Sequence, residues 1–380
     1  MLKTMVKEKM KVPICMPQFD EDEVSQVTEA VRAGWVSFGE KLDLFEKKLA
    51  EYLEVKYVVA VNSGSAAVDV ALRSLDIYKK EVITTATSCT PTANSIINSN
   101  NKPVMVDISR EDYNIDPDWI EKSITKNTSA ILPVHLYGRP ANLTKILEIG
   151  KKHNIPVIED CAQAMGAKYK GKMVGSFGEV GCFSLNISKI ITTGEGGFIS
   201  TNNEQVAENA RIIRNYGREP SNTDFLYTYN GYNFKYTNLQ AALGLAQLKK
   251  INSFIKSRRE NASYLRESLE DESVLQLPTE RKDEFCVYFC FPLLLKEEGI
   301  RDNLKKFLEG RGVQTRTLFR PMFMQPYYLK LFGETNAPCP NAEHVGNNGF
   351  YVGCCPGLTK EQLDFTAASI KEGLSLYASG

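Results

Sequence analysis

The sequence predicts an α/β fold, with a large domain built on a mostly parallel sheet covered by helices and a smaller α+β domain at the C-terminus. Short apolar runs alternate with amphipathic segments over the first 200 residues, which is the pattern of βαβ units. These runs are continuous in apolar residues, as expected for strands covered on both faces. The alternation weakens near residue 250, so we predict domains over residues 1–250 and 251–380.

The individual elements follow in chain order. Two helices, at 20–34 and 40–53, are predicted from apolar residues at helical spacing before the first strand. Strands are predicted at 57–61, 82–86, 104–108, 130–136, 156–160, 180–185 and 197–201, with helices at 65–75, 90–99, 116–124 and 142–153. Further on, we expect one long helix or two joined by a kink at 237–269, a strand pair or one long strand at 285–295, and helices at 302–312 and 359–377.

Composition excludes several classes of protein. The 380 residues are 43% hydrophobic and 24% charged, with a formal net charge of zero. This balance does not support binding to nucleic acid or to a membrane surface through bulk charge. No run reaches the roughly 18 apolar residues of a membrane span. The N-terminal MLKTMVKEKMKV lacks the apolar core of a signal peptide, so we expect a cytoplasmic protein.

The cysteines point the same way. There are nine, an odd number, and several lie in apolar, strand-like runs. This is not the pattern of a disulfide framework, and it favours free thiols in a reducing compartment. With three histidines and no ligand spacing typical of zinc, no metal site is expected.

The segment NSGSAAVDVALRSL, residues 62–75, follows a predicted strand and opens a helix. Gly64 allows a ligand to approach the backbone closely, and Ser63 and Ser65 bring hydroxyl groups to the helix start. Free N–H groups at a helix N-terminus bind anions. The alternative is an N-cap and turn with no ligand.

The segment PVIEDCAQAMGA, residues 156–167, places Glu159 and Asp160 at the end of a buried strand. Ligands of open α/β sheets bind beyond the carboxyl ends of the strands. An acid there can hold a cationic ring nitrogen. The alternative is that Asp160 only caps the following turn.

The segment SLNISKIITTGEGGF, residues 184–198, carries Lys189 on a glycine-rich loop after a strand. It is neither a Walker A loop nor a GxGxxG motif. Taken alone, Lys189 reads as a solvated surface charge. Amides at 233, 238 and 240 precede an apolar helix and read alone as caps. Together, however, an anion site, an acid at a strand end, a lysine and these amides are what pyridoxal phosphate requires.

These motifs also carry a resemblance to a known family. With GWVSFG (34–39), TPTAN (90–94), VHLYG (134–138), TRTLFRPM (315–322) and PGLT (356–359), the chain resembles the DegT/DnrJ/EryC1/StrS family of pyridoxal-phosphate-dependent nucleotide-sugar aminotransferases, especially its perosamine-synthase-like members. The resemblance covers essentially the whole chain. It implies the fold-type I, aspartate aminotransferase-like class.

The resemblance implies roles for individual residues. Lys189 matches the lysine that forms a Schiff base with the cofactor, and Asp160 matches the partner of the pyridinium nitrogen. Gln163 matches a residue at the ring hydroxyl. Asn233 matches an amide that reaches the phosphate of the neighbouring subunit, which implies a homodimer with shared active sites. A phosphate cup is expected from Gly64, Ser65, Ala66 and Ser184.

Two positions depart from the family pattern. Cys89 stands where many members place an aromatic ring over the cofactor, and Asn186 with Ile187 stands where many have an aromatic or His-Pro pair. We therefore assign Cys89 to the cofactor side and Asn186 to the substrate side. Arg316 and Arg320 are candidates for binding substrate phosphates or a carboxylate. The alternative for both arginines is an ordinary position at the surface or core edge.

The implied reaction moves an amino group from glutamate to a keto group of a nucleotide-linked 4-keto-6-deoxyhexose. Amination at C4 is favoured over C3. One alternative is a sugar dehydratase, but the family's dehydratases replace the lysine with histidine and Lys189 is present. Another cyclic ketone such as an inosose, or a non-catalytic regulatory protein, stays open. The sequence leaves the nucleotide base and the sugar configuration undetermined.

Overall fold

The computed structural model describes residues 11–219, 226–333 and 338–378, and its centre is a seven-stranded sheet. Strands β2 (Glu81–Thr85), β3 (Lys102–Val106) and β4 (Thr128–Leu132) are parallel. Single parallel bridges join the β4 edge to β5 (Ile158–Asp160), which pairs with β8 (Val180–Ser184). Strand β9 (Gly197–Thr201) is antiparallel to both β8 and β1 (Tyr57–Val61). The order is therefore β3-β2-β4-β5-β8-β9-β1, which confirms the mostly parallel sheet.

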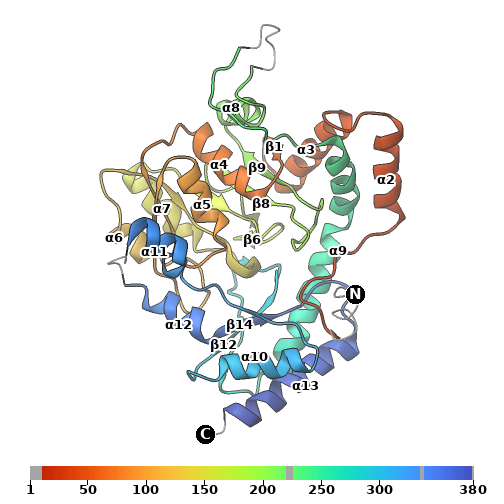
Figure 1. Cartoon of the computed structure of the whole chain (residues 1–380), viewed down its shortest axis with the longest axis vertical. Helices are drawn as coiled ribbons and strands as arrows, with labels where there is room; N and C mark the ends of the chain where they lie inside the picture. Colours follow the sequence, from red (N-terminus) through yellow and green to blue (C-terminus); the bar gives the residue numbers. More distant parts are fainter. Residues whose placement is uncertain (1–10, 220–225, 334–337, 379–380) are drawn as a thin grey trace.

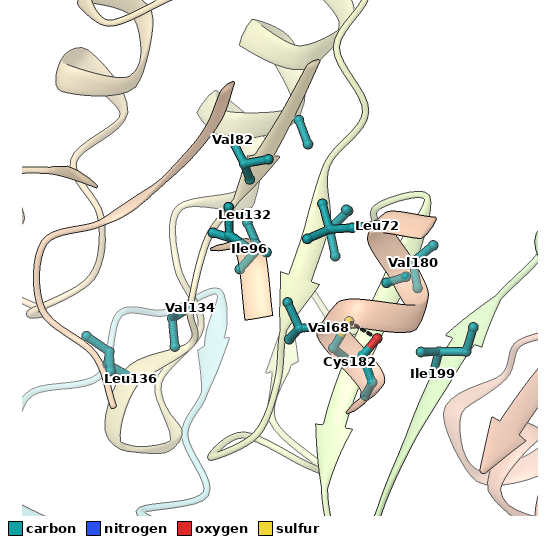
Figure 2. Close-up of a cluster of buried hydrophobic side chains, with 14 of the residues drawn as sticks. Val68, Leu72, Val82, Ile96, Leu132, Val134, Leu136, Val180, Cys182 and Ile199 are labelled. Atoms are coloured by element: carbon teal, nitrogen blue, oxygen red, sulfur yellow. Dashed lines mark hydrogen bonds between the residues drawn. The ribbon is translucent and has the colours of Figure 1, made fainter. Parts of the chain in front are cut away.

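Helices cover both faces of this sheet. Helix α4 (Gly64–Ser74) packs on β8 and β9 and against α5 (Pro91–Asn98) and α8 (Glu204–Arg214). Figure 2 shows Val68 and Leu72 of α4 among buried side chains of the sheet. Full burial of each such aliphatic side chain stabilises the fold by about 1.5–3 kcal/mol. On the opposite face, α6 (Pro117–Lys122) packs on α7 (Leu143–His153), and both helices share a buried cluster with Ile83 of β2 and Ile131 of β4.

A second buried cluster lies where α3 (Glu40–Leu53) contacts β1. Leu42, Phe45, Leu49 and Leu53 recur every three or four positions and are all buried, which is the apolar stripe expected of an amphipathic helix. The preceding helix, α2 (Glu21–Arg32), begins with a capping box formed by Asp20 and Glu23. Both predicted N-terminal helices are thereby confirmed.

The predicted helical region at 237–269 is one continuous helix, α9 (Asn238–Leu269), rather than two. It begins with a capping box between Thr237 and Gln240. In Figure 1 it runs from beside α3 to the C-terminal part of the molecule, where it packs on α13 (Lys360–Tyr377). The domain boundary that we predict at residue 250 falls inside this helix and stays a prediction.

A second, antiparallel sheet has the order β10 (Leu275–Gln276), β12 (Phe291–Leu295), β14 (Gly349–Val352) and β13 (Arg316–Thr317). Helices α10 (Arg301–Gly310) and α13 contribute to its buried cluster. Helices α11 (Pro326–Phe332) and α12 (Pro340–Asn348) complete this part of the chain.

The prediction for 285–295 was wrong in detail. Strand β11 (Glu284–Phe285) pairs with β6 (Lys168–Tyr169), which also pairs with β7 (Lys172–Met173), whereas β12 belongs to the second sheet. Between β11 and β12, Tyr288 has a left-handed φ of 48°. A bulky side chain rarely adopts this conformation, and it turns the chain from one sheet to the other.

All nine cysteines lie in the described part of the chain and are unpaired, as predicted, with Cys89 exposed and seven of them buried. Among the described residues, no helix combines the length and apolar character needed to cross a bilayer.

A buried polar pair lies at the end of β5. His135 accepts a hydrogen bond from the Ala141 N–H through Nδ1, so its Nε2 carries the proton and donates to Glu159 at 3.1 Å. The Glu159 oxygens also accept three backbone N–H groups at 2.8 Å each, those of Gly175, Phe177 and Gly178. Cys161 lies close enough for a three-ligand cation site, but these hydrogen bonds already use the carboxylate. We interpret the pair as support for β5.

We expect Glu159→Gln to destabilise the protein by about 3 kcal/mol. The NH2 group of the new amide would face backbone N–H groups, and these would lose the oxygen that accepts their hydrogen bonds. Although burial opposes it, hydrogen bonding lowers the pKa of Glu159 below its ordinary value. The stabilisation that the ionised Glu159 carboxylate provides is therefore complete above the pKa that this group has in the unfolded chain. It is lost as the pH falls through the lower pKa that the group has in the folded protein. Urea unfolding measures the effect. Glu179→Gln, at an exposed position, is the control and should stay within about 0.5 kcal/mol.

Candidate active site

A cleft of about 860 Å³ lies beside the lysine loop, residues 185–196, and the second sheet. Its walls come from distant parts of the sequence, including the N-terminal segment, α9, α10 and β13. The cleft brings together six of the residues predicted from sequence, namely Cys89, Gln163, Asn186, Lys189, Arg316 and Arg320.

Lys189 projects from the lysine loop, which backbone hydrogen bonds close onto itself. Leu185 donates to the Gly196 carbonyl at 2.8 Å and accepts from Thr193 at 2.9 Å. The Lys189 Nζ lies 5.0 Å from the centre of the Phe289 ring. Burial lowers the pKa of Lys189 from that of an ordinary lysine, against the opposing charge of Asp160. The structure therefore does not show Lys189 as a solvated surface charge.

Asp160 ends β5 and is buried. Its Oδ2 accepts a hydrogen bond from the Thr92 hydroxyl at 2.9 Å and its Oδ1 accepts from the Ala162 N–H at 3.0 Å. Burial raises the pKa of Asp160, while these hydrogen bonds and Lys189 oppose the rise. Asp160 does not line the cleft directly, but its charge interacts with Lys189 and Cys89, which do.

The residues predicted for the phosphate cup lie around the start of α4. The Ser63 hydroxyl accepts from the Ala66 N–H at 3.1 Å, so that N–H is already used. In the described chain, no acceptor bonds the N–H groups of Gly64 and Ser65. Gly64 packs directly on Ser184, because an added Cβ would lie 2.8 Å from the Ser184 Cβ. Gly64, Ser65, Ala66 and Ser184 do not line the cleft itself.

Two side chains facing the cleft have defined orientations. The Gln163 Oε1 accepts from the Tyr137 N–H at 2.8 Å, which leaves its NH2 group as a donor. Asn186 folds back on the lysine loop, donating to Glu195 at 2.8 Å and accepting from Ser188 at 3.0 Å. Asn186 therefore stabilises the loop in this structure, in addition to lining the cleft.

Arg316 and Arg320 are exposed and Lys305 is half-buried, and all three line the cleft. We call these three residues the basic rim. Asn233, in contrast, is exposed and outside the cleft, and its carbonyl accepts from the Asn62 side chain at 3.1 Å.

Sequence reasoning missed several residues of the site. Cys15, Arg258, Phe289 and Tyr351 line the cleft but lie far from the motifs along the chain. Thr92 belongs to TPTAN, and its position three residues after Cys89 was the one signal that could have identified it. The others become visible only when the second sheet and α9 are placed beside the lysine loop.

The model of the DegT/DnrJ/EryC1/StrS aminotransferase family matches residues 17–371. The chain belongs to this family. It is thus a pyridoxal-phosphate-dependent aminotransferase of fold type I, as the sequence predicted.

Several relatives align with this aminotransferase over nearly their whole lengths. GDP-perosamine synthase of Escherichia coli O157:H7 is 34% identical, over 95% of this chain and 98% of that protein. GDP-perosamine synthase of Caulobacter vibrioides is also 34% identical, over 96% and 98%. Among solved structures, Helicobacter pylori PseC, an aminotransferase of pseudoaminic acid biosynthesis, superposes with a TM-score of 0.92 at 27% identity, covering 96% of this chain and all of that one.

The residues present fit the cofactor of this aminotransferase. Two open N–H groups at a helix start suit a phosphate, and the missing side chain at Gly64 lets the Ser184 side chain lie against that helix start. A buried carboxylate suits a protonated ring nitrogen, and Lys189 has no carboxylate within 4.0 Å among the described residues. The family and this donor set therefore agree.

Proposed function

We propose that this aminotransferase moves the amino group of glutamate to C4 of a nucleotide-linked 4-keto-6-deoxyhexose, for polysaccharide or O-antigen biosynthesis in the cytoplasm. The similarity to three GDP-perosamine synthases, at 31–34% identity over at least 95% of this chain, carries the proposal. Relatives named for lipopolysaccharide and spore coat polysaccharide biosynthesis add support for the pathway class. The unpaired thiols support the compartment.

Lys189 is the proposed proton carrier. When bound, the cofactor supplies an electron-accepting ring that stabilises negative charge on the substrate carbon. Lys189 takes the proton from the carbon of the donor that bears the amino group. It then gives the proton to the carbon on the other side of that nitrogen. It can accept a proton only as a neutral amine, and burial favours that form by lowering its pKa.

Asp160 is the proposed partner of the ring nitrogen. Thr92 and the Ala162 N–H fix both carboxylate oxygens, so the charge is held in one orientation. Gln163 is proposed to donate its NH2 group to the ring hydroxyl, since Tyr137 fixes the other end of the amide. The phosphate is assigned to Gly64, Ser65, Ala66 and Ser184, with the N–H groups of Gly64 and Ser65 as donors.

The basic rim is the proposed site of the nucleotide diphosphate. Arg316 and Arg320 present exposed guanidinium groups, which bind phosphate oxygens through paired hydrogen bonds. Asn186 and Cys89 are proposed to contact the sugar and the cofactor side of the cleft. A thiol at Cys89 leaves more room than the aromatic ring that many family members have at this position.

We also propose a homodimer in which Asn233 contributes to the partner's site. Asn233 is exposed and outside the cleft of its own chain. Exposed aromatic side chains, among them Trp35 at 68% exposure and Tyr232, lie in the two loops that contact the start of α9. Apolar side chains this exposed are typical of interfaces. A monomer in sedimentation equilibrium at micromolar concentration would contradict the proposal.

The reaction is tested by incubating the enzyme with glutamate and GDP-, UDP- or dTDP-linked 4-keto-6-deoxyhexoses. We expect one of these sugars to be aminated at C4, with the position read from the NMR spectrum of the product, and 2-oxoglutarate to form in equal amount. Amination at C3, of an inosose, or of no ketone at all would refute the proposed substrate.

A further inference from the structure

Four arginines of the described chain are buried, and one of them differs from the rest. Arg139, Arg214 and Arg301 each have a carboxylate partner, those of Glu284, Glu46 and Asp302. Arg258, at 3% exposure, has no carboxylate within 4.0 Å among the described residues. Burying an unpaired charge costs several kcal/mol, so its retention calls for an anion from outside the chain.

The groups that surround Arg258 do not supply that anion. Its Nη1 donates to the carbonyls of Tyr288 at 3.3 Å and Phe289 at 2.9 Å, and its Nε has no hydrogen-bond partner. The thiols nearby stay protonated, because burial raises the pKa of Cys354 to about 12 and also raises that of Cys15. Carbonyl dipoles therefore offset the charge only in part.

Arg258 lines the same cleft as Lys189. The two are linked through one residue, because Arg258 bonds the Phe289 carbonyl and the Phe289 ring lies 5.0 Å from the Lys189 Nζ. An anion bound to Arg258 would therefore lie in the same cleft as the Lys189 amine. The diphosphate of a nucleotide sugar has its own candidate site in the basic rim, whose two arginines are exposed.

We infer that Arg258 binds the carboxylate of the amino donor that adjoins the reacting carbon, and the same carboxylate of the 2-oxo acid product. The inference rests on the proposed function, which needs an amino acid in this cleft. A guanidinium group recognises a carboxylate through two parallel hydrogen bonds. The sugar substrate has no such carboxylate, so Arg258 serves the donor and leaves the sugar to the basic rim.

The test is a calorimetric titration of the cofactor-loaded enzyme with glutarate, a dicarboxylate that has no amino group to react, and separately with GDP and inorganic phosphate. Arg258→Gln should weaken glutarate binding by about tenfold or more, since a charged hydrogen bond is lost, and should change GDP binding by less than about twofold. Arg258→Lys should fall between. Across the Arg258 variants, the KM for glutamate should rise in parallel with the dissociation constant of glutarate.

Arg259→Gln is the matched control. Arg259 is the next residue on α9, pairs with Glu280 at 2.8 Å and bonds the Cys286 carbonyl at 2.7 Å, but it does not line the cleft. Arg259 therefore helps to hold the 286–289 segment, as Arg258 does, but it lacks the proposed contact with the ligand. We expect its glutarate affinity to match that of the wild type.

Unchanged glutarate affinity in a folded Arg258→Gln protein would overturn the inference, as would a selective loss of GDP or phosphate binding. If neither Arg258 variant folds, a crystal structure of the wild type with glutarate decides, and a carboxylate bound away from the guanidinium group refutes the inference. An enzyme that binds glutarate through Arg258 but aminates no nucleotide sugar would refute the proposed function alone.

Discussion

Replacing Lys189 with alanine is expected to reduce amino transfer on the order of 10⁴-fold. The substitution removes both the proposed covalent attachment point of the cofactor and the proposed proton carrier, and such groups each contribute large factors to rate. No other lysine can replace it at short range, because Lys305 is the only other lysine of the described chain that lines the cleft and it belongs to the basic rim. Single-turnover absorbance measurements with glutamate give the rate.

Lys305→Ala is the control for charge in the same cleft. Because Lys305 lies on α10, at the basic rim, its loss should raise the KM for the nucleotide sugar and leave the glutamate half-reaction unchanged. A Lys189→Ala enzyme that keeps more than a tenth of the wild-type rate would show that another group carries the proton.

Asp160→Asn is expected to lower the rate by about 10²–10³-fold, the range found when a single electrostatic group of an active site is removed. Asparagine has the same shape, and its oxygen can still accept from the Ala162 N–H while Thr92 can turn its hydroxyl to accept from the new NH2. The loss therefore reports the charge rather than the fold. An unchanged melting temperature checks this, and an unchanged rate would contradict the assigned role.

The same residue gives an expected pH dependence. Burial raises the pKa of Asp160, so its carboxyl stays protonated to a higher pH than an ordinary aspartic acid. Because the ionised form is the one proposed to hold the ring nitrogen, the rate should fall as the pH decreases through this raised pKa. The acidic limb of the profile should disappear in Asp160→Asn. A limb that survives the substitution belongs to another group.

Much of the fold was predictable because strands and helices of the large sheet have strong local patterns. The apolar run at 57–61 and the spaced apolar residues of 40–53 gave elements that the structure confirms. Helix α8 was missed, although Val206, Ala207, Ala210 and Ile213 follow helical spacing and form its buried face. The split of 285–295 was not predictable, since the left-handed turn at Tyr288 is stabilised by contacts with Gly138 and Arg258, far along the chain.

The candidate site divides in the same way. Lys189, Asp160 and Gly64 lie in motifs whose residue types and order predict the cofactor, and the family match confirms that cofactor. Arg258 lies in a helix rich in charged residues, where nothing local separates it from Arg259. Only burial and the absence of an acid beside it single it out, and both are properties of the packed chain.

Helix α9 acts as a spacer of fixed length. Gln247 accepts from the Thr192 N–H of the lysine loop at 3.4 Å, and Arg258 bonds the Phe289 carbonyl. These two residues are eleven positions apart, about three turns, so they face the same side roughly 16 Å from each other. One inserted residue would rotate the second contact by about 100° away from the first. Between these two positions, therefore, the helix cannot gain or lose a single residue and keep both contacts.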